Sequence, residues 1–489
     1  MKKIIAIVTL GIFLTLSLDA KPPRRSMKNE GTMYEVPGSI YDAPRLMPAA
    51  TQQYLPINLA PRGLVILVSF SDVEFQTEKA EIDSMLNGSN YVRDFDYSYY
   101  WDETLYEGHL HHEGSARQYF EASSFGQYSP HFDVVGPVRI NKSYSTYGQG
   151  FKESASKVSP MIGAAVDSVK NEVDFSIYDH NGDGVVDFVY VIYAGRGEAD
   201  TPENTNLIWP KASYGVSGAP LYNGKSIGRW ACSNEMNPNG QHDGLSTFAH
   251  EFSHVLGLPD FYIVHGSANH KTLDYWDIMD YGTYLNEGNT PPLYSAYERF
   301  FFGWLTPTLL TGPVTDTLPS IEEHNVARMI TLTNSSNLIG NNTNPSTYWL
   351  LENRQLVGWD AYLPGSGLLL SKLNINSNWT NSSTNDDASN QGNDIIEADG
   401  DASSPYYAKA TDAFPAGATS YLGIPNHELT DIQEVDGKII YKHQGGTPTE
   451  SGRVSAEELE TKGTQKIWHE GQIYIYHNNR YYNLLGQPL

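Results

Sequence analysis

The chain has 489 residues, of which 57 are acidic and 32 are basic, so its formal charge at pH 7 is −25. A charge of this sign repels phosphate backbones and anionic membrane surfaces, and nucleic acid is therefore excluded as an expected partner. The length is sufficient for two or three domains, or for one large domain with appendages. Cys232 is the single cysteine, so an intramolecular disulfide is impossible. We expect Cys232 to be a small buried core residue, the alternative being a thiol that caps a metal in a latent form.

The N-terminus has the layout of a secretory signal peptide. Two lysines, Lys2 and Lys3, precede an apolar run over residues 4–18, and polar chain returns around Ala20. We therefore predict a signal peptide over residues 1–20 and a protein that is secreted or held at the cell surface. A membrane anchor is the alternative, but the run is short for a full span. No later segment is apolar enough to cross a bilayer, so no membrane span is expected after cleavage.

Residues 21–60 are rich in Pro, Ala and Arg and are predicted to be a pro-segment or a loose lead-in. From Gly63 onward, apolar runs alternate with segments of helical pattern, which indicates a mixed α/β layer structure. We assign residues 61–310 to a catalytic domain. Its predicted strands are 64–70, 132–135 and 188–193, and its predicted helices are 115–125, 159–169, 245–256 and 293–302. At the start of the predicted helix over 159–169, Ser159 is expected to be the N-cap and Pro160 to occupy the first helical position.

Oxygen-bearing side chains alternate along residues 179–187. They are those of Asp179, Asn181, Asp183 and Asp187, and Gly184 permits a sharp turn between them. This resembles the first half of a calcium loop, although a strand follows instead of the second helix of an EF-hand. We predict a calcium site here, and an ordinary Asn/Gly/Asp turn is the alternative.

The chemistry is concentrated in the string from His250 to Asp260. His250 and His254 lie one turn apart on a predicted helix, so both imidazoles can reach one ion. Glu251 lies beside them and can take a proton from a metal-activated water without being a ligand itself. Gly257 ends the helix, and the chain can then turn back so that Asp260 supplies a third ligand. Three protein ligands and one open position are what a catalytic zinc needs, whereas the alternative is a pair of ordinary surface histidines.

Beyond the catalytic domain the sequence becomes β-like with long polar loops. We assign residues 311–445 to a β-rich continuation, residues 446–465 to a linker and residues 466–489 to a short β-like tail. The tail resembles the C-terminal sorting tails of surface-secreted bacterial proteins. A last hairpin packed on the β-rich region is the alternative.

About twenty residues after the zinc string comes Trp276-Asp277-Ile278-Met279-Asp280-Tyr281-Gly282. This stretch resembles the Met-turn of metzincins. Together, His-Glu-x-x-His-x-x-Gly-x-x-Asp and Met-x-Tyr resemble the secreted bacterial immune inhibitor A family of metallopeptidases, and the likeness covers about residues 60–420. It implies an α+β, metzincin-like fold with an active-site helix and a backing helix. It also implies that Met279 is structural and that Tyr281 stabilises the oxyanion or touches the metal.

One departure from that family is visible at Ser371-Lys372-Leu373-Asn374, where relatives often continue into a Trp-His-x-Asp-like strand. If that strand normally contributes a functional polar group, the group is missing here.

We therefore predict a secreted zinc-dependent endopeptidase that acts on protein or peptide substrates, with zinc and calcium as its cofactors. The first alternative is a non-catalytic surface adhesin that keeps the peptidase fold. The presence of Glu251 argues against it, because a binding module needs no general base. A metal hydrolase that acts on a non-peptide bond is the second alternative.

Overall fold

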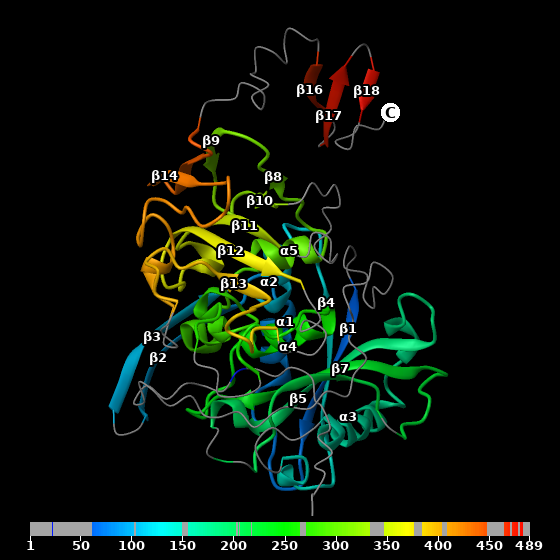
Figure 1. The fold of residues 1–489 in the computed structure, drawn as a ribbon. Coiled ribbons are helices and arrows are strands. Elements are labelled where there is room, and N and C mark those ends of the chain that lie inside the picture. Colours follow the sequence, from blue (N-terminus) through cyan, green and yellow to red (C-terminus); the bar gives the residue numbers. More distant parts are fainter. Residues whose placement is uncertain are drawn as a thin grey trace, which may run out of the picture.

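The computed structural model describes Pro22, most of residues 61–446 and three short strands between residues 464 and 482 (Figure 1). Within 61–446 the segments outside the description are 102–103, 149–154, 202–203, 205, 217, 265–269, 333–346, 376–383 and 403–407. The predicted signal peptide over 1–20, nearly all of the lead-in over 21–60, residues 447–463 of the predicted linker and residues 483–489 of the predicted tail therefore lie outside the described residues.

The first sheet has five strands in the order β4-β1-β5-β7-β6. The strands are β1 Arg62–Ser69, β4 His131–Arg139, β5 Val185–Arg196, β6 Lys211–Tyr214 and β7 Ser226–Met236. All neighbours run parallel except β6, which pairs antiparallel with β7 at the edge. The strands predicted from the apolar runs at 64–70, 132–135 and 188–193 are thus confirmed.

Both faces of this sheet are covered, which explains the unbroken apolar run in β1. Val65 and Leu67 belong to one core cluster, which also contains side chains of helix α4. Leu64, Ile66 and Val68 belong to a second cluster, which contains side chains of helix α3. Because successive side chains of a strand point to opposite faces, the two clusters lie on opposite sides of the sheet. Figure 1 shows α3 below the sheet and α4 above it.

Five α-helices are present in the described residues. They are α1 Lys79–Asn87, α2 Ala116–Ser123, α3 Ala155–Val169, α4 Leu245–Leu256 and α5 Ala296–Phe301. Helices α2 and α5 each begin at a serine capping box, formed by Ser115 with Gln118 and by Ser295 with Glu298. The predicted start of α3 at Ser159-Pro160 is wrong, because the helix already includes Ala155 and holds Pro160 in its interior.

A second sheet follows in the order β13-β12-β11-β10-β8. The strands are β8 Thr308–Leu309, β10 Arg328–Ile330, β11 Thr347–Arg354, β12 Gly367–Asn374 and β13 Asn393–Ile395. Leu350 of β11 and Leu369 of β12 belong to the same core cluster as the side chains of α4. One face of the second sheet therefore packs into the core that supports α4, and Figure 1 shows β11 and β12 beside α5.

Three smaller sheets complete the described structure. Strands β9 Val314–Leu318, β14 Leu429–Val435 and β15 Lys438–His443 form one of them. Strands β2 Val92–Trp101 and β3 Thr104–Glu113 form a hairpin. Strands β16 Thr464–His469, β17 Gln472–His477 and β18 Arg480–Tyr482 pair only with one another. Among the described helices, none combines the length and the apolar character that a membrane crossing requires.

Candidate metal centre

Helix α4 carries the predicted histidines and is buried along its whole length. Phe248 and Phe252 form its apolar stripe and pack against the first sheet, where their rings contact Phe132 and Phe188. His250 and His254 lie on a different face of the same helix, and both are buried. Because the aromatic stripe fixes the rotation of the helix about its axis, it also fixes the direction in which the two imidazoles point.

Gly257 ends the helix and turns the chain back. Its φ of 115° lies in the left-handed region, and its amide donates to the carbonyls of Ser253 and His254. The amide of Leu258 donates to Ser253 as well, which completes the reversal. Asp260, three residues after the glycine, is thereby brought to the two histidines, as the spacing predicted.

The three side chains meet in a small buried triangle. The Nε2 atoms of His250 and His254 are 3.2 Å apart. One carboxylate oxygen of Asp260 lies 3.3 Å from Nε2 of His250 and 3.4 Å from Nε2 of His254. Among the described residues, no other set of three His, Cys, Asp or Glu side chains brings its ligand atoms within 4.8 Å of one another.

Hydrogen bonds select the tautomer that a metal needs. Nδ1 of His250 lies 2.7 Å from the carbonyl oxygen of Ile278, and Nδ1 of His254 lies 2.8 Å from that of Leu258. A carbonyl only accepts, so each Nδ1 carries the proton and each Nε2 presents a lone pair to the triangle. Two lone pairs that face each other cannot form a hydrogen bond with one another, whereas both can bind one cation.

The charges of the triangle follow from its burial. Burial lowers the pKa of His250, although the carboxylate of Asp260 opposes this change. For Asp260 burial alone would raise the pKa, but the neighbouring His254 and His250 lower it on balance. The neutral imidazole and the ionised carboxylate are the protonation states in which these groups bind a metal.

The turn over residues 277–279 makes hydrogen bonds to both segments that carry the triangle. Ile278 supplies the carbonyl that orients His250, and the carbonyl of Met279 accepts the amide of Phe261, the residue after Asp260. The Asp277 carboxylate holds the turn by accepting the amide of Met279 at 2.8 Å. The Met279 side chain is fully buried in the core cluster that also contains α4. The turn therefore braces both the helix and the loop that carries the third side chain of the triangle.

Comparison with known proteins identifies the family of this chain. The immune inhibitor A peptidase M6 catalytic domain matches residues 58–304, which is half of the chain. The chain belongs to the immune inhibitor A family of M6 peptidases.

One similar protein is named for this family, and another is named as a metalloprotease. Immune inhibitor A of Bacillus thuringiensis subsp. alesti is 27% identical over 279 residues, or 49% of this chain and 39% of the relative. The pre-pro-metalloprotease PrtV of Vibrio cholerae serotype O1 is 27% identical over 215 residues, or 38% of this chain and 23% of the relative. The match thus spans between about a quarter and two fifths of the length of these relatives.

In this M6 family chain Glu251 is fully buried on α4, next to His250 in the sequence. Tyr281 lies in a separate apolar cluster with Tyr262 and Val264. Its ring centroid is 6.2 Å from that of Tyr284, whose hydroxyl donates to the carbonyl of Pro22. Pro22, the one described residue of the first sixty, is itself buried. A residue of the predicted lead-in therefore lies against the aromatic cluster that contains Tyr281.

The sequence did not single out Asn385, which ties the C-terminal half of this M6 family chain to the metal centre. Its side-chain amide donates at 2.8 Å to the carbonyl of Phe261, directly after Asp260, and at 2.7 Å to that of Asn393. Its side-chain oxygen accepts the amides of Gly392 and Asn393. Asn385 is fully buried, and its backbone carbonyl lies 2.7 Å from Nε2 of His270. No local pattern marks an asparagine of this kind, because Phe261, its partner at the metal centre, lies 124 residues away.

The predicted calcium loop does not form a comparable cluster. The Asp179 carboxylate accepts the amides of Asp183 and Gly184 and binds the ammonium of Lys225 at 2.6 Å. The Asp187 carboxylate accepts the amide of His180 and also pairs with its ring. These hydrogen bonds shape a tight turn. Calcium binding at Asp179, Asn181, Asp183 and Asp187 stays a prediction.

Cys232 lies in the core cluster on the α3 side of the first sheet, together with Trp230 and Val191. This is the face opposite to α4. The prediction of a small buried core residue is confirmed, and the structure gives no support to the alternative of a thiol that caps the metal.

Proposed function

We propose that this chain is a secreted zinc-dependent endopeptidase with a metzincin-like catalytic domain. The observation that carries the proposal is the triangle of His250, His254 and Asp260. Tetrahedral ligands about 2.0–2.1 Å from one ion are about 3.3 Å from each other. The three measured separations of 3.2, 3.3 and 3.4 Å fit that requirement. Two imidazoles and one carboxylate also form a donor set suited to zinc and leave one position for water or substrate.

Zinc, when bound there, would supply a Lewis acid that polarises the scissile carbonyl and the attacking water. His250 and His254 hold their lone pairs toward the ion because the carbonyls of Ile278 and Leu258 occupy the opposite ring nitrogens. Asp260 contributes the negative charge, and its burial excludes competing water.

Glu251 is proposed as the general base. It sits one residue after His250, on a helix whose rotation is fixed by Phe248 and Phe252, so its carboxylate has a defined position relative to the triangle. In that role it accepts a proton from the attacking water and passes it to the leaving nitrogen. Tyr281 is proposed to donate a hydrogen bond to the developing oxyanion, on the basis of its place after the Met-turn.

The organisation of the chain is part of the proposal. Residues 1–20 would direct export, and residues 21–60 would form a pro-segment, for which the contact between Pro22 and Tyr284 gives support. Residues 61–310 would carry the catalytic machinery, and residues 311–445 would continue from it as a β-rich region. Residues 466–489 would form a tail beyond a linker.

The test combines metal analysis with one substitution. The purified protein should contain about one zinc per chain, and it should digest a diverse peptide library unless a chelator is present. Glu251→Ala should keep the zinc and lose peptidase activity by about three orders of magnitude or more. A Glu251→Ala protein that digests casein as fast as the parent would exclude the proposed mechanism. A parent that binds zinc and cleaves no peptide would favour the adhesin alternative.

A further inference from the structure

A cavity with a volume of about 720 Å³ is lined by residues other than those of the metal triangle. It is bordered by the end of the β2–β3 hairpin, by the end of α2 and by the short helix η6 Gly358–Asp360. Its volume is within the range of about 300–1,000 Å³ that ligand sites occupy. None of its lining residues belongs to the metal triangle or to the Met-turn.

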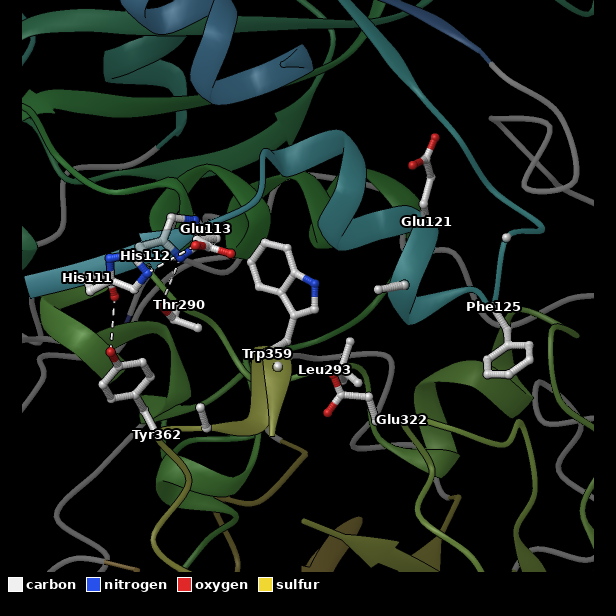
Figure 2. A pocket seen from close by; sticks show the side chains of 14 residues that line it. His111, His112, Glu113, Glu121, Phe125, Thr290, Leu293, Glu322, Trp359 and Tyr362 are labelled. Atoms are coloured by element: carbon white, nitrogen blue, oxygen red, sulfur yellow. Dashed lines mark hydrogen bonds and ion pairs between the residues drawn. The ribbon is translucent and has the colours of Figure 1, made fainter. Parts of the chain in front are cut away.

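The lining is acidic and aromatic. Glu113, Glu121 and Glu322 are its charged residues besides two histidines, and no Lys or Arg is among the described residues that line it. Glu121 accepts from Arg117 and from Ser129, and the mostly exposed Glu113 lies 3.3 Å from Nε2 of His111. Figure 2 shows Glu113 and Glu322 on either side of the indole ring of Trp359, which stands in the middle of the cavity.

Glu322 has an oxygen that no group of the described chain satisfies. Its Oε2 atom is buried and makes no hydrogen bond, whereas the backbone amide of Trp359 donates to the carboxylate. Arg354, which pairs with Asp360, and Arg299, which donates to backbone carbonyls, favour the charged form of Glu322 but make no hydrogen bond to its Oε2. Burial, with Asp360 adding to it, raises the pKa of Glu322 to about 7. A buried carboxylate oxygen without a partner is unfavourable, and the charge of a cation bound beside this carboxylate would reduce that penalty.

The turn beside Glu322 leaves room for its carboxylate. Gly358 has a φ of 54°, and a Cβ atom at this position would lie 1.8 Å from Oε1 of Glu322. A side chain there would displace the carboxylate from the cavity. The glycine therefore allows the close approach of the acid to this turn.

The ring of Trp359 is held firmly. Its centroid is 5.2 Å from that of Tyr119 and 5.4 Å from that of His112, both at steep angles. Gly114 lies against its edge, where a Cβ atom would come within 2.7 Å of the ring. A fixed indole face beside two carboxylates is the combination that attracts an organic cation, because the ring and the acids both present negative potential.

We propose that this cavity binds one arginine or lysine side chain of a polypeptide, with the cation against Trp359 and beside Glu322. The cavity is larger than one such side chain, which leaves room for the neighbouring residues of the bound chain. The site is separate from the metal triangle, so binding there does not depend on hydrolysis.

The test measures the binding of short peptides that carry a single arginine, compared with peptides that carry citrulline, its neutral isostere. The full chain with Glu251→Ala is used so that no peptide is cleaved, and binding is followed by calorimetry. The arginine peptide should bind at least tenfold more tightly than the citrulline peptide. Glu322→Gln should remove that preference, whereas Glu323→Gln, a substitution of the exposed neighbouring acid, should leave it intact.

Trp359→Leu should weaken the arginine peptide by about tenfold, and an unchanged melting temperature would show that the variant is folded. Equal binding of the two peptides, or an intact preference in Glu322→Gln, would overturn the proposal. Arginine amide that binds as tightly as the peptide would overturn the assignment to a polypeptide. Because the readout is binding, these results are independent of whether the metal centre cleaves peptides.

Discussion

Replacing Asn385 with alanine tests whether the C-terminal half of the chain is part of the metal centre. Its side chain connects strand β13 with the loop that follows Asp260, through two donated and two accepted hydrogen bonds. Alanine removes all four bonds and cannot recruit replacements from within the protein. The carbonyl of Phe261 loses the partner that holds it next to the third side chain of the triangle.

The size of the effect follows from these contacts. A buried polar group left without a partner costs about 1–3 kcal/mol. The amide of Gly392 keeps a second acceptor in the carbonyl of Thr384, so the loss falls mainly on Phe261 and Asn393. We expect the free energy of unfolding to fall by about 2–5 kcal/mol, a large share of the ~5–15 kcal/mol that stabilises a typical protein. Zinc affinity should fall by about 10–100-fold, as is usual when a group that positions a ligand is removed.

Two measurements on Asn385→Ala test whether the asparagine supports the metal centre. They are the zinc dissociation constant, from competition with a chelator, and the free energy of unfolding by denaturant with zinc present. The matched control is Asn390→Ala, because Asn390 is exposed and lies on the same segment. The control should resemble the parent in both measurements. If Asn385→Ala loses stability but binds zinc as tightly as the parent, the asparagine is only structural. If neither quantity changes, the reasoning from its hydrogen bonds is wrong.

Three further predictions concern pH, calcium and the tail. Burial raises the pKa of Asp277 from 3.8 to about 7, so the stability that its protonated form confers is present below about pH 4 and is lost as the pH rises through 7. As the pH rises from 5 to 8, Asp277→Asn should therefore gain stability relative to the parent by at most about 3 kcal/mol. An equal difference in unfolding free energy at pH 5 and pH 8 would contradict this. Calcium should raise the melting temperature of the parent, because a ligand at a hundredfold excess over its dissociation constant stabilises the folded state by about 2.7 kcal/mol. A full calcium response in Asp183→Ala would exclude this loop as the calcium site. A chain that ends near Gly445 should fold and cleave peptides like the full chain but be mislocalised in its host. Loss of soluble protein on this truncation would favour a packed hairpin over a sorting tail.

The features that sequence predicted best are those whose contacts are local. Helix α4 begins at Leu245 and ends at Leu256, as its apolar period and Gly257 indicated. The approach of His250, His254 and Asp260 needs only one helical turn and one left-handed glycine, so it is contained within eleven residues. Nothing distant has to be known to place these side chains together.

The features that sequence missed depend on partners far along the chain. Lys225, which binds Asp179, lies 46 residues beyond it, and no pattern within the loop reveals its presence. The start of α3 was misplaced because Pro160 is tolerated inside this helix, where packing of the apolar face outweighs the loss of one backbone hydrogen bond. Asn385 and the cavity around Trp359 likewise arise only when segments more than a hundred residues apart meet.

Buried hydrogen bonds also cross the point where the family match ends, at residue 304. The backbone amide of Leu293 donates to Asp360 at 2.9 Å, and that of Ala296 donates to Glu352 at 2.6 Å. Arg354 makes a bidentate pair with Asp360 inside the same network, and all of these side chains are buried. Separating the two parts would break these hydrogen bonds and expose the apolar core cluster to which both parts contribute. The segment that carries the acids and the helix that they cap therefore belong to one cooperative unit, which explains how a residue as distant as Asn385 can reach the metal centre.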